Sequence, residues 1–229
     1  MRTLILSCNT GAGHNSCAKA LRETFTANGE VCDIIDALQF ISERASQFIS
    51  NWHTRIYLYA PKLFKAGYQG AENHDSLFRE GTGIYKFLTS GADRMYDYIV
   101  EGEYDNIICT HVFPALAITE MLERHPSMRI TTSFISTDYT CSPSVSDSNL
   151  EWYFIPAESL KNEFVRCGVP GEKLIASGLP AKRAFYARPD KKAAKAALGF
   201  DEDQRHLLVM CGSMGCGPIR DITELLCEN

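Results

Sequence analysis

Short apolar runs alternate along the chain with segments whose apolar residues recur every three or four positions. The run at residues 3–7 ends in a glycine-containing turn, after which Ala18, Leu21 and Phe25 fall at helical spacing. A second apolar run occupies residues 31–35. This order of strand, turn, helix and strand predicts a βαβ unit at the start of the chain.

The same alternation continues through the next part of the chain. It predicts three helices, at 85–100, 114–123 and 158–167. It also predicts four strands, at 105–111, 129–136, 152–156 and 173–176. Because short strands separated by helices form parallel sheets that are covered on both sides, we expect an α/β protein with a Rossmann-like parallel sheet and helices on both faces.

The pattern changes after this series. A polar, alanine- and lysine-rich stretch is typical of a surface helix that is capped by Asp190 and closed by Gly199. From His206 an apolar run, a glycine-rich turn and a helix start repeat the order seen at the N-terminus. We therefore expect three segments, with the last one holding the first strand and helix of a truncated second domain: 1–187, a linker at 188–205, and 206–229.

The composition narrows the functional class. Hydrophobic residues make up 45% of the chain and charged residues 22%, which favours a folded core. The net charge of −5 lacks the basic footprint of a protein that binds nucleic acid. The nine cysteines form no CxxC pair, which favours a reduced, cytoplasmic protein without a structural zinc site. No segment approaches the roughly 20 apolar residues of a spanning helix, so any membrane contact is expected to be peripheral.

Two glycine-rich turns, at residues 11–13 and 212–217, stand between a predicted strand and a predicted helix. Such turns let a ligand approach the backbone and direct amide groups at an anion. Neither turn completes the G-x-G-x-x-G fingerprint or a P-loop. Each therefore fits a ligand site and a tight turn without a ligand equally well.

Two histidines follow predicted strands. His14 lies just after the first glycine turn, at the edge of the sheet where open α/β folds bind ligands. A helix N-terminus favours a neutral imidazole, which could accept a proton from an alcohol. His111 ends another predicted strand. For both histidines, helix capping or core packing is the competing interpretation.

Five segments taken together resemble a known family. They are, in chain order, 9–14, 110–114, 136–139, 177–180 and 207–217. Their combination resembles the monogalactosyldiacylglycerol synthases and processive diacylglycerol glucosyltransferases, and more distantly the peptidoglycan glycosyltransferase that adds N-acetylglucosamine to a lipid carrier. The resemblance covers essentially the whole chain. It implies the N-terminal, acceptor-side half of a GT-B fold.

The resemblance also implies an activity and roles for individual residues. The reaction would be an inverting, metal-independent transfer of a hexose from a UDP-sugar to diacylglycerol, with no cofactor. His14 would be the general base, and Asp138 would orient His14 or the acceptor, or only cap its loop. The implied acceptor- or lipid-binding residues are Gly11, Gly13, His111, Pro114, Trp52 and Tyr59. The implied donor-phosphate residues are Gly212, Gly215 and Gly217.

Trp52 and Tyr59 belong to an apolar seam that predicts a long helix beginning near Ile41. Aromatic residues beside lysine and arginine suit a membrane interface, although a stripe at helical spacing also fits core packing. We expect a cytoplasmic protein that associates peripherally with the membrane. Because most of a donor domain is missing, we expect the 229-residue chain itself to be catalytically silent. Two alternatives are a non-catalytic lipid-binding or acceptor-binding module, and a UDP-sugar-binding GT-B protein such as an epimerase.

Overall fold

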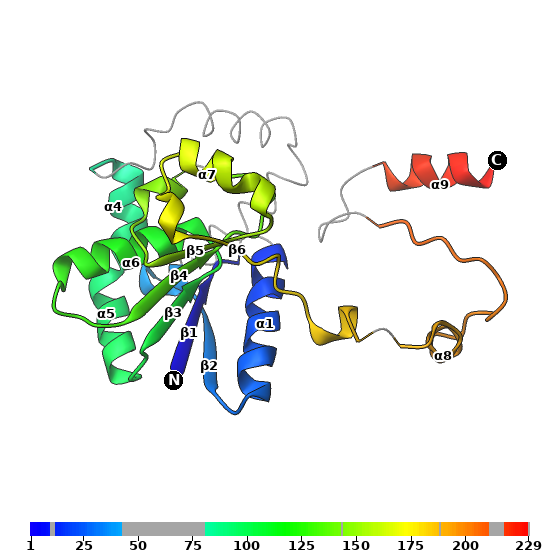
Figure 1. The fold of residues 1–229 in the computed structure, drawn as a ribbon, viewed down its shortest axis with the longest axis horizontal. Helices are drawn as coiled ribbons and strands as arrows, with labels where there is room; N and C mark the ends of the chain where they lie inside the picture. Colours follow the sequence, from blue (N-terminus) through cyan, green and yellow to red (C-terminus); the bar gives the residue numbers. More distant parts are fainter. Residues whose placement is uncertain (10–11, 43–80, 143, 188, 211–217, 229) are drawn as a thin grey trace. The chain divides into compact units, whose positions relative to one another are not determined.

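The computed structural model describes residues 1–9, 12–42, 81–142, 144–187, 189–210 and 218–228. The chain divides into two compact units, Met1–Ala181 and Lys182–Asn229 (Figure 1). The predicted long helix with Trp52 and Tyr59 lies outside the described residues, as do Gly11, Gly212, Gly215 and Gly217.

The first unit is built on a six-stranded parallel sheet. Its strands are β1 Arg2–Ser7, β2 Val31–Asp36, β3 Asn106–Cys109, β4 Thr131–Ile135, β5 Trp152–Ile155 and β6 Leu174–Ala176. They lie in the order β2-β1-β3-β4-β5-β6, and every neighbouring pair is parallel. The predicted α/β class with a Rossmann-like parallel sheet is confirmed.

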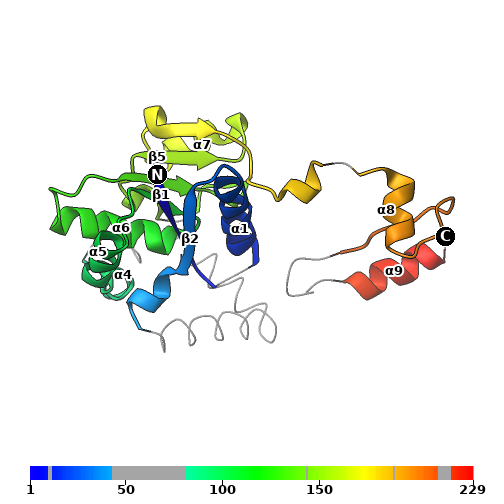
Figure 2. The same ribbon diagram turned by 90° about the horizontal axis from the view of Figure 1, so that it is seen from below.

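Helices lie on both faces of this sheet. They are α1 Ala12–Ala27, α4 Gly83–Thr89, α5 Ala92–Glu101, α6 Val112–Arg124 and α7 Lys161–Arg166. Figure 2 shows α1 on one side of the sheet and α4, α5 and α6 on the other. This arrangement follows from handedness: the crossover from β1 to β2 runs in the opposite direction to the later crossovers, and right-handed crossovers of opposite direction place their helices on opposite faces.

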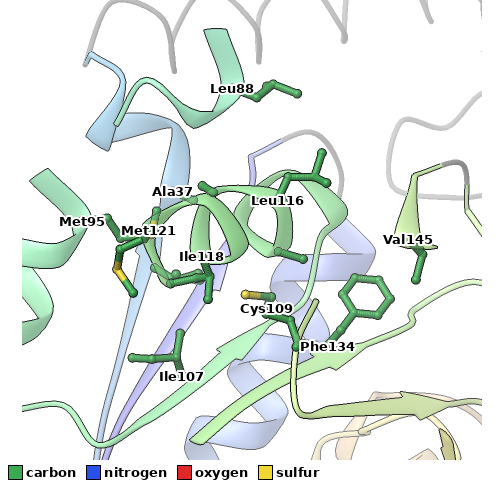
Figure 3. Close-up of a cluster of buried hydrophobic side chains, with 14 of the residues drawn as sticks. Ala37, Leu88, Met95, Ile107, Cys109, Leu116, Ile118, Met121, Phe134 and Val145 are labelled. Atoms are coloured by element: carbon green, nitrogen blue, oxygen red, sulfur yellow. The ribbon is translucent and has the colours of Figure 1, made fainter. Parts of the chain in front are cut away.

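The two faces have separate cores because successive strand residues point in opposite directions. Leu4 and Leu6 of β1 join the larger cluster, whereas Ile5 between them joins a smaller cluster under α1. Figure 3 shows part of the larger cluster, in which Ile118 of α6 points toward Ile107 of β3. Both of these isoleucines are fully buried.

The α1 face of the sheet is only partly covered by the described helices of this unit. Beside α1 there is an apolar groove of about 450 Å³, whose lining includes Leu21 and Phe25 of α1 and Ile108, Ile135 and Phe154 of the sheet. The topology explains the groove, because every crossover after β2 runs toward β6 and places its helix on the opposite face.

The described residues include seven cysteines, and all seven are free thiols. Four of them are buried and serve as packing groups: Cys8, Cys17, Cys32 and Cys109. Burial raises the pKa of Cys17 to about 12 and that of Cys32 to about 11, and it also raises the pKa of Cys8 and of Cys109 well above the ordinary value of a thiol. Thiols with such high pKa values stay protonated and behave as small hydrophobic side chains.

The predicted helix at 85–100 is in fact two helices, α4 and α5, that are separated at Ser90 and Gly91. At this break the chain passes close to another segment. A Cβ atom on Gly91 would lie 2.6 Å from the backbone carbon and oxygen of Phe40. The residue must therefore be glycine for reasons of space, since its φ of −88° is open to any residue.

Gly91→Ala is expected to lower the free energy of unfolding by about 1–3 kcal/mol, because the backbone of Phe40 cannot move aside as a flexible side chain could. Gly83→Ala is the matched control. A Cβ atom on Gly83 would meet no atom within 4 Å, so that variant should be neutral or more stable by up to about 1 kcal/mol. Urea denaturation of the two variants measures both effects. Equal stability of the variants would contradict the close approach at Gly91.

Among its described residues, the second unit contains two short α-helices, α8 Lys191–Ala197 and α9 Ile219–Cys227, and a 3-10 helix at Arg183–Phe185. The predicted capping of α8 is confirmed: the Asp190 carboxylate accepts a hydrogen bond from the backbone N–H of Ala193 at 2.9 Å, and Gly199 has a φ of +72°. The predicted strand beginning at His206 is not formed over residues 206–210, which have no regular structure. A strand needs a neighbouring strand for its backbone N–H and C=O groups, and hydrophobicity alone does not supply one.

Candidate functional site

Three adjacent strands end at the candidate site. His14 lies in the first turn of α1, which follows β1, while His111 lies two residues beyond β3 and Thr137 two residues beyond β4. The chain leaves β1 toward β2, on the side opposite to β3. The crevice between β1 and β3 is therefore the topological switch point, the place where open parallel sheets bind ligands.

The ring of half-buried His14 is held by two oxygen atoms. Its Nδ1 lies 2.7 Å from the backbone oxygen of Thr110 and 2.9 Å from Oγ1 of Thr137. A carbonyl oxygen can only accept a hydrogen bond, so Nδ1 must carry the hydrogen and donate it. In the neutral ring Nε2 then has a free electron pair. The backbone of β3 thus selects the tautomer in which the outer nitrogen of His14 is a base.

The neighbouring ring, His111, has the opposite tautomer when it is neutral. His111 is the N-cap residue of α6, and its Nδ1 accepts a hydrogen bond of 3.1 Å from the backbone N–H of Phe113. Its hydrogen must then lie on Nε2. The rings of His111 and His14 meet edge to face, with 4.6 Å between their centroids. His111 therefore caps a helix, as one interpretation proposed, and also lies against His14.

A chain of hydrogen bonds ties the start of α1 to the ends of β1 and β2. The hydroxyl of Ser7 donates to Asn15 Oδ1 at 2.7 Å, and Asn15 Nδ2 donates to Asn9 Oδ1 at 2.8 Å. Asn9 Nδ2 then donates to Asp36 Oδ2 at 3.0 Å. All donors point toward the carboxylate, so each bond polarises the next. The first turn of α1, which carries His14 and Asn15, is thereby tied to the ends of two strands.

The hydrogen bonds of Asp36 are relevant to the alternative function, a UDP-sugar-binding protein such as an epimerase. In dinucleotide-binding Rossmann folds an acidic residue near the end of the second strand binds the ribose hydroxyls. Here Oδ2 of Asp36 accepts from Asn9, and Oδ1 accepts from the backbone N–H of Leu38 at 3.1 Å. Asp36 is also buried, with 9% of its surface exposed, so it is not presented to a ribose hydroxyl as such an acidic residue would be.

The motif at 136–139 reaches His14 through Thr137, whose Oγ1 lies 2.9 Å from Nδ1 of the ring. We expected Asp138 to orient His14 or the acceptor, or only to cap its loop, and its role toward the acceptor stays a prediction. Asp138 is exposed, and its backbone oxygen accepts a hydrogen bond of 3.2 Å from Ser136 Oγ. The position of Thr137 in the sequence could have identified it as a site residue, because Thr137, like His111, comes two residues after the end of its strand.

Two other predicted acceptor residues lie in the described part of the chain. Gly13 is exposed, and a Cβ atom there would meet no atom of the described residues within 4 Å. Pro114 is instead buried in α6. Its predicted role in binding the acceptor stays a prediction.

The loop that carries Thr137 is fastened to α7. Oε1 of Glu163 accepts two hydrogen bonds of 2.7 Å, one from the backbone N–H of Cys141 and one from the hydroxyl of Thr140. These bonds favour the ionised carboxylate and hold the pKa of Glu163 below its ordinary value of 4.5.

The lowered pKa of Glu163 predicts a pH dependence of stability. The folded protein binds this proton less readily than the unfolded chain, so the contribution of Glu163 is complete above about pH 4.5 and is lost as the pH falls through the folded-state pKa. The difference in unfolding free energy between wild type and Glu163→Gln should therefore be constant near neutral pH and shrink below about pH 4.5. Urea denaturation at several pH values measures it. A difference that grows on acidification would contradict this assignment.

Among the residues that the structure describes, no helix has both the length and the apolar character needed to cross a membrane.

Comparisons with known proteins match most of the first unit to one family. Residues 14–181 match the model of monogalactosyldiacylglycerol (MGDG) synthase. A processive diacylglycerol beta-glucosyltransferase of Bacillus mycoides (strain KBAB4) is 22% identical over 228 residues, covering 97% of this chain and 56% of the relative. The protein of the same name from Bacillus cereus (strain B4264) is 22% identical over 229 residues, with the same coverage. The chain thus spans little more than half the length of these relatives.

Proposed function

The chain belongs to the monogalactosyldiacylglycerol synthase family, and on this premise we propose that it forms the acceptor-side half of an enzyme that transfers a hexose from a UDP-sugar to diacylglycerol with inversion. The proposal includes a cytoplasmic enzyme that meets its lipid acceptor at the membrane surface. It is supported by the names of the relatives, which describe glucosyl transfer to diacylglycerol.

The observation that carries the proposal is the contact of 2.7 Å between His14 Nδ1 and the backbone oxygen of Thr110. This contact leaves Nε2 of His14 as a proton acceptor at the switch point of the sheet. A general base must lie where the substrate binds and must be unprotonated when it acts. His14 meets the first requirement by its position, and in the neutral ring the Nδ1 contact places the free electron pair on Nε2.

The proposed reaction is a single displacement. Nε2 of His14 takes the proton of the acceptor hydroxyl while the hydroxyl oxygen forms a bond to the anomeric carbon of the sugar. The bond from that carbon to the diphosphate oxygen breaks, and its electron pair leaves with UDP. One displacement inverts the anomeric centre and requires no nucleophile from the enzyme.

The donor site is assigned in this proposal to the other half of the enzyme. The amide groups around Gly212, Gly215 and Gly217 would bind the departing diphosphate by fixed dipoles. Residues 1–229 cover 56% of the length of the relatives, and the remainder would supply the rest of the nucleotide site. We propose that the 229-residue chain alone does not transfer sugar.

The test is a transfer assay with UDP-glucose or UDP-galactose and vesicles that contain diacylglycerol. An enzyme that continues this chain through a donor half is expected to form glycosyldiacylglycerol, and the 229-residue chain alone is expected to form none. Interconversion of the two UDP-sugars without any lipid acceptor would support the epimerase alternative instead. Transfer by the chain alone would overturn the assignment of the donor site.

A further inference from the structure

The loop that follows β4 is fixed on both sides of its contact with His14. Before the contact, Ser136 Oγ donates to the backbone oxygen of Asp138 at 3.2 Å, and Ser136 is almost completely buried. After the contact, Thr140 and Cys141 both donate to Glu163. The hydroxyl of Thr137 is presented to the imidazole from this restrained segment.

We propose that Thr137 is a positioning residue for His14, and that Glu163 on α7 keeps Thr137 in place through the loop. The proposal rests on the proposed function in one respect, namely that His14 is the base. Neither Thr137 nor Glu163 needs to touch the substrate. Their effect is on the orientation and tautomer of one imidazole ring.

Two acceptors restrain the ring better than one. The oxygen of Thr110 comes from the end of β3, and the hydroxyl of Thr137 comes from the loop after β4, so the shared Nδ1 hydrogen of His14 points between two neighbouring strands. Rotation of the ring toward either strand lengthens one of these two hydrogen bonds. With the carbonyl alone, the ring could pivot about a single bond.

The second acceptor also matters when the ring becomes charged. After Nε2 takes a proton, the positive charge spreads over both ring nitrogens, and the bonds from Nδ1–H become charge-assisted and stronger. The same principle operates where a buried carboxylate orients a catalytic histidine, but here both acceptors are uncharged. This arrangement explains how His14 can be oriented without the carboxylate of Asp138.

Glu163 contributes because its two hydrogen bonds fix the far end of the loop. Both are 2.7 Å long and end on one ionised oxygen, which makes them the short, charge-assisted kind. The anchored Thr140 is three residues from Thr137. If the hydrogen bonds to Glu163 are lost, the loop becomes more mobile, and this mobility extends over a short stretch of backbone to the contact between Thr137 and His14.

The primary test is a ¹⁵N NMR measurement of the His14 side chain in the 229-residue chain, because the shifts of the two ring nitrogens report which one carries the proton. In the wild type we expect the Nδ1-protonated tautomer. Thr137→Val keeps the shape of the side chain but removes the second acceptor. The ring can then pivot away from the Thr110 oxygen, and because the rings that do so lose the contact that fixes the tautomer, the variant should give a mixture of tautomers. Thr137→Ser restores the hydroxyl and should restore the wild-type shifts. Glu163→Gln should fall between wild type and Thr137→Val.

Thr24→Val is the matched control, because it makes the same change in α1 at a hydroxyl that bonds only within its own helix turn, to the backbone oxygen of Ala20 at 3.1 Å. It should leave the ring shifts of His14 unchanged. The backbone amide spectrum of each variant shows whether it is folded. Wild-type ring shifts in a folded Thr137→Val protein would overturn the proposal, and so would failure of Thr137→Ser to restore them.

A kinetic arm separates this proposal from the proposed function. In an enzyme that continues through a donor half, Thr137→Val should lower kcat about threefold to tenfold, which is the effect of one neutral hydrogen bond, with KM for diacylglycerol unchanged. If the tautomer shifts but kcat does not, His14 is positioned as proposed and is not the base. If kcat depends on His14 but the ¹⁵N shifts of its ring are unchanged in Thr137→Val, the assignment of His14 as the base stands and the positioning proposal fails.

Discussion

Replacing His14 by asparagine is expected to lower kcat for sugar transfer by about 10²–10⁴-fold, the usual contribution of a general base. Asparagine is the informative replacement, since its side-chain N–H₂ can still donate to the Thr110 oxygen that Nδ1 now contacts at 2.7 Å. No atom of asparagine reaches the position of Nε2. The local structure should therefore persist while proton transfer is lost.

The measurement is kcat and KM for diacylglycerol in an enzyme that continues this chain through a donor half. Binding of the acceptor should change little, because the proposed role of His14 is proton transfer. His125→Gln is the control: this histidine lies at the opposite end of α6 from His111 and stacks on Tyr96. It should keep kcat near the wild-type value. An asparagine variant with more than about a tenth of the wild-type kcat would exclude His14 as the base.

Ile118→Ala is expected to lower the free energy of unfolding by about 2–5 kcal/mol. Ile118 is fully buried and points from α6 toward Ile107 of β3, so its removal leaves a cavity in the middle of the larger core (Figure 3). The cost combines the lost burial of apolar surface with the unfilled space. Because a domain is stable by only about 5–15 kcal/mol, this one change is a large fraction of the total.

The same substitution at an exposed site provides the comparison. Ile84 of α4 has 41% of its surface exposed, and Ile84→Ala should change the unfolding free energy by about 1 kcal/mol or less, because little burial is lost and alanine favours the helix. Urea denaturation followed by circular dichroism measures both variants. Similar losses in the two would contradict the packing of α6 against β3.

Sequence patterns were sufficient for features that depend on near neighbours. The apolar periodicity correctly predicted the first βαβ unit, and the positions of Asp190 and Gly199 correctly predicted how α8 begins and ends. These features follow from side-chain alternation and from the backbone needs of helix ends, which are local properties.

Other predictions from the sequence were wrong or incomplete because the residues that decide them are distant in the chain. At the break between α4 and α5, Gly91 lies against the backbone of Phe40, a contact that no pattern around residue 91 reveals. The apolar run at 206–210 has the composition of a strand but does not form one, because strand formation depends on a pairing partner. An apolar sequence shows that a segment can be buried, but it does not show that the segment has a strand to pair with.

The amino-acid sequence by itself determined that this protein has a parallel α/β sheet, that it resembles the diacylglycerol glycosyltransferases, and that His14 and His111 follow strands. Only the tertiary structure decided that Thr110, 96 residues away, selects the tautomer of His14, and that Thr137, 123 residues away, shares its hydrogen. The reason is physical: the direction of a hydrogen bond depends on atoms brought together by the order of strands in the sheet, and spacing along the chain carries no record of that order.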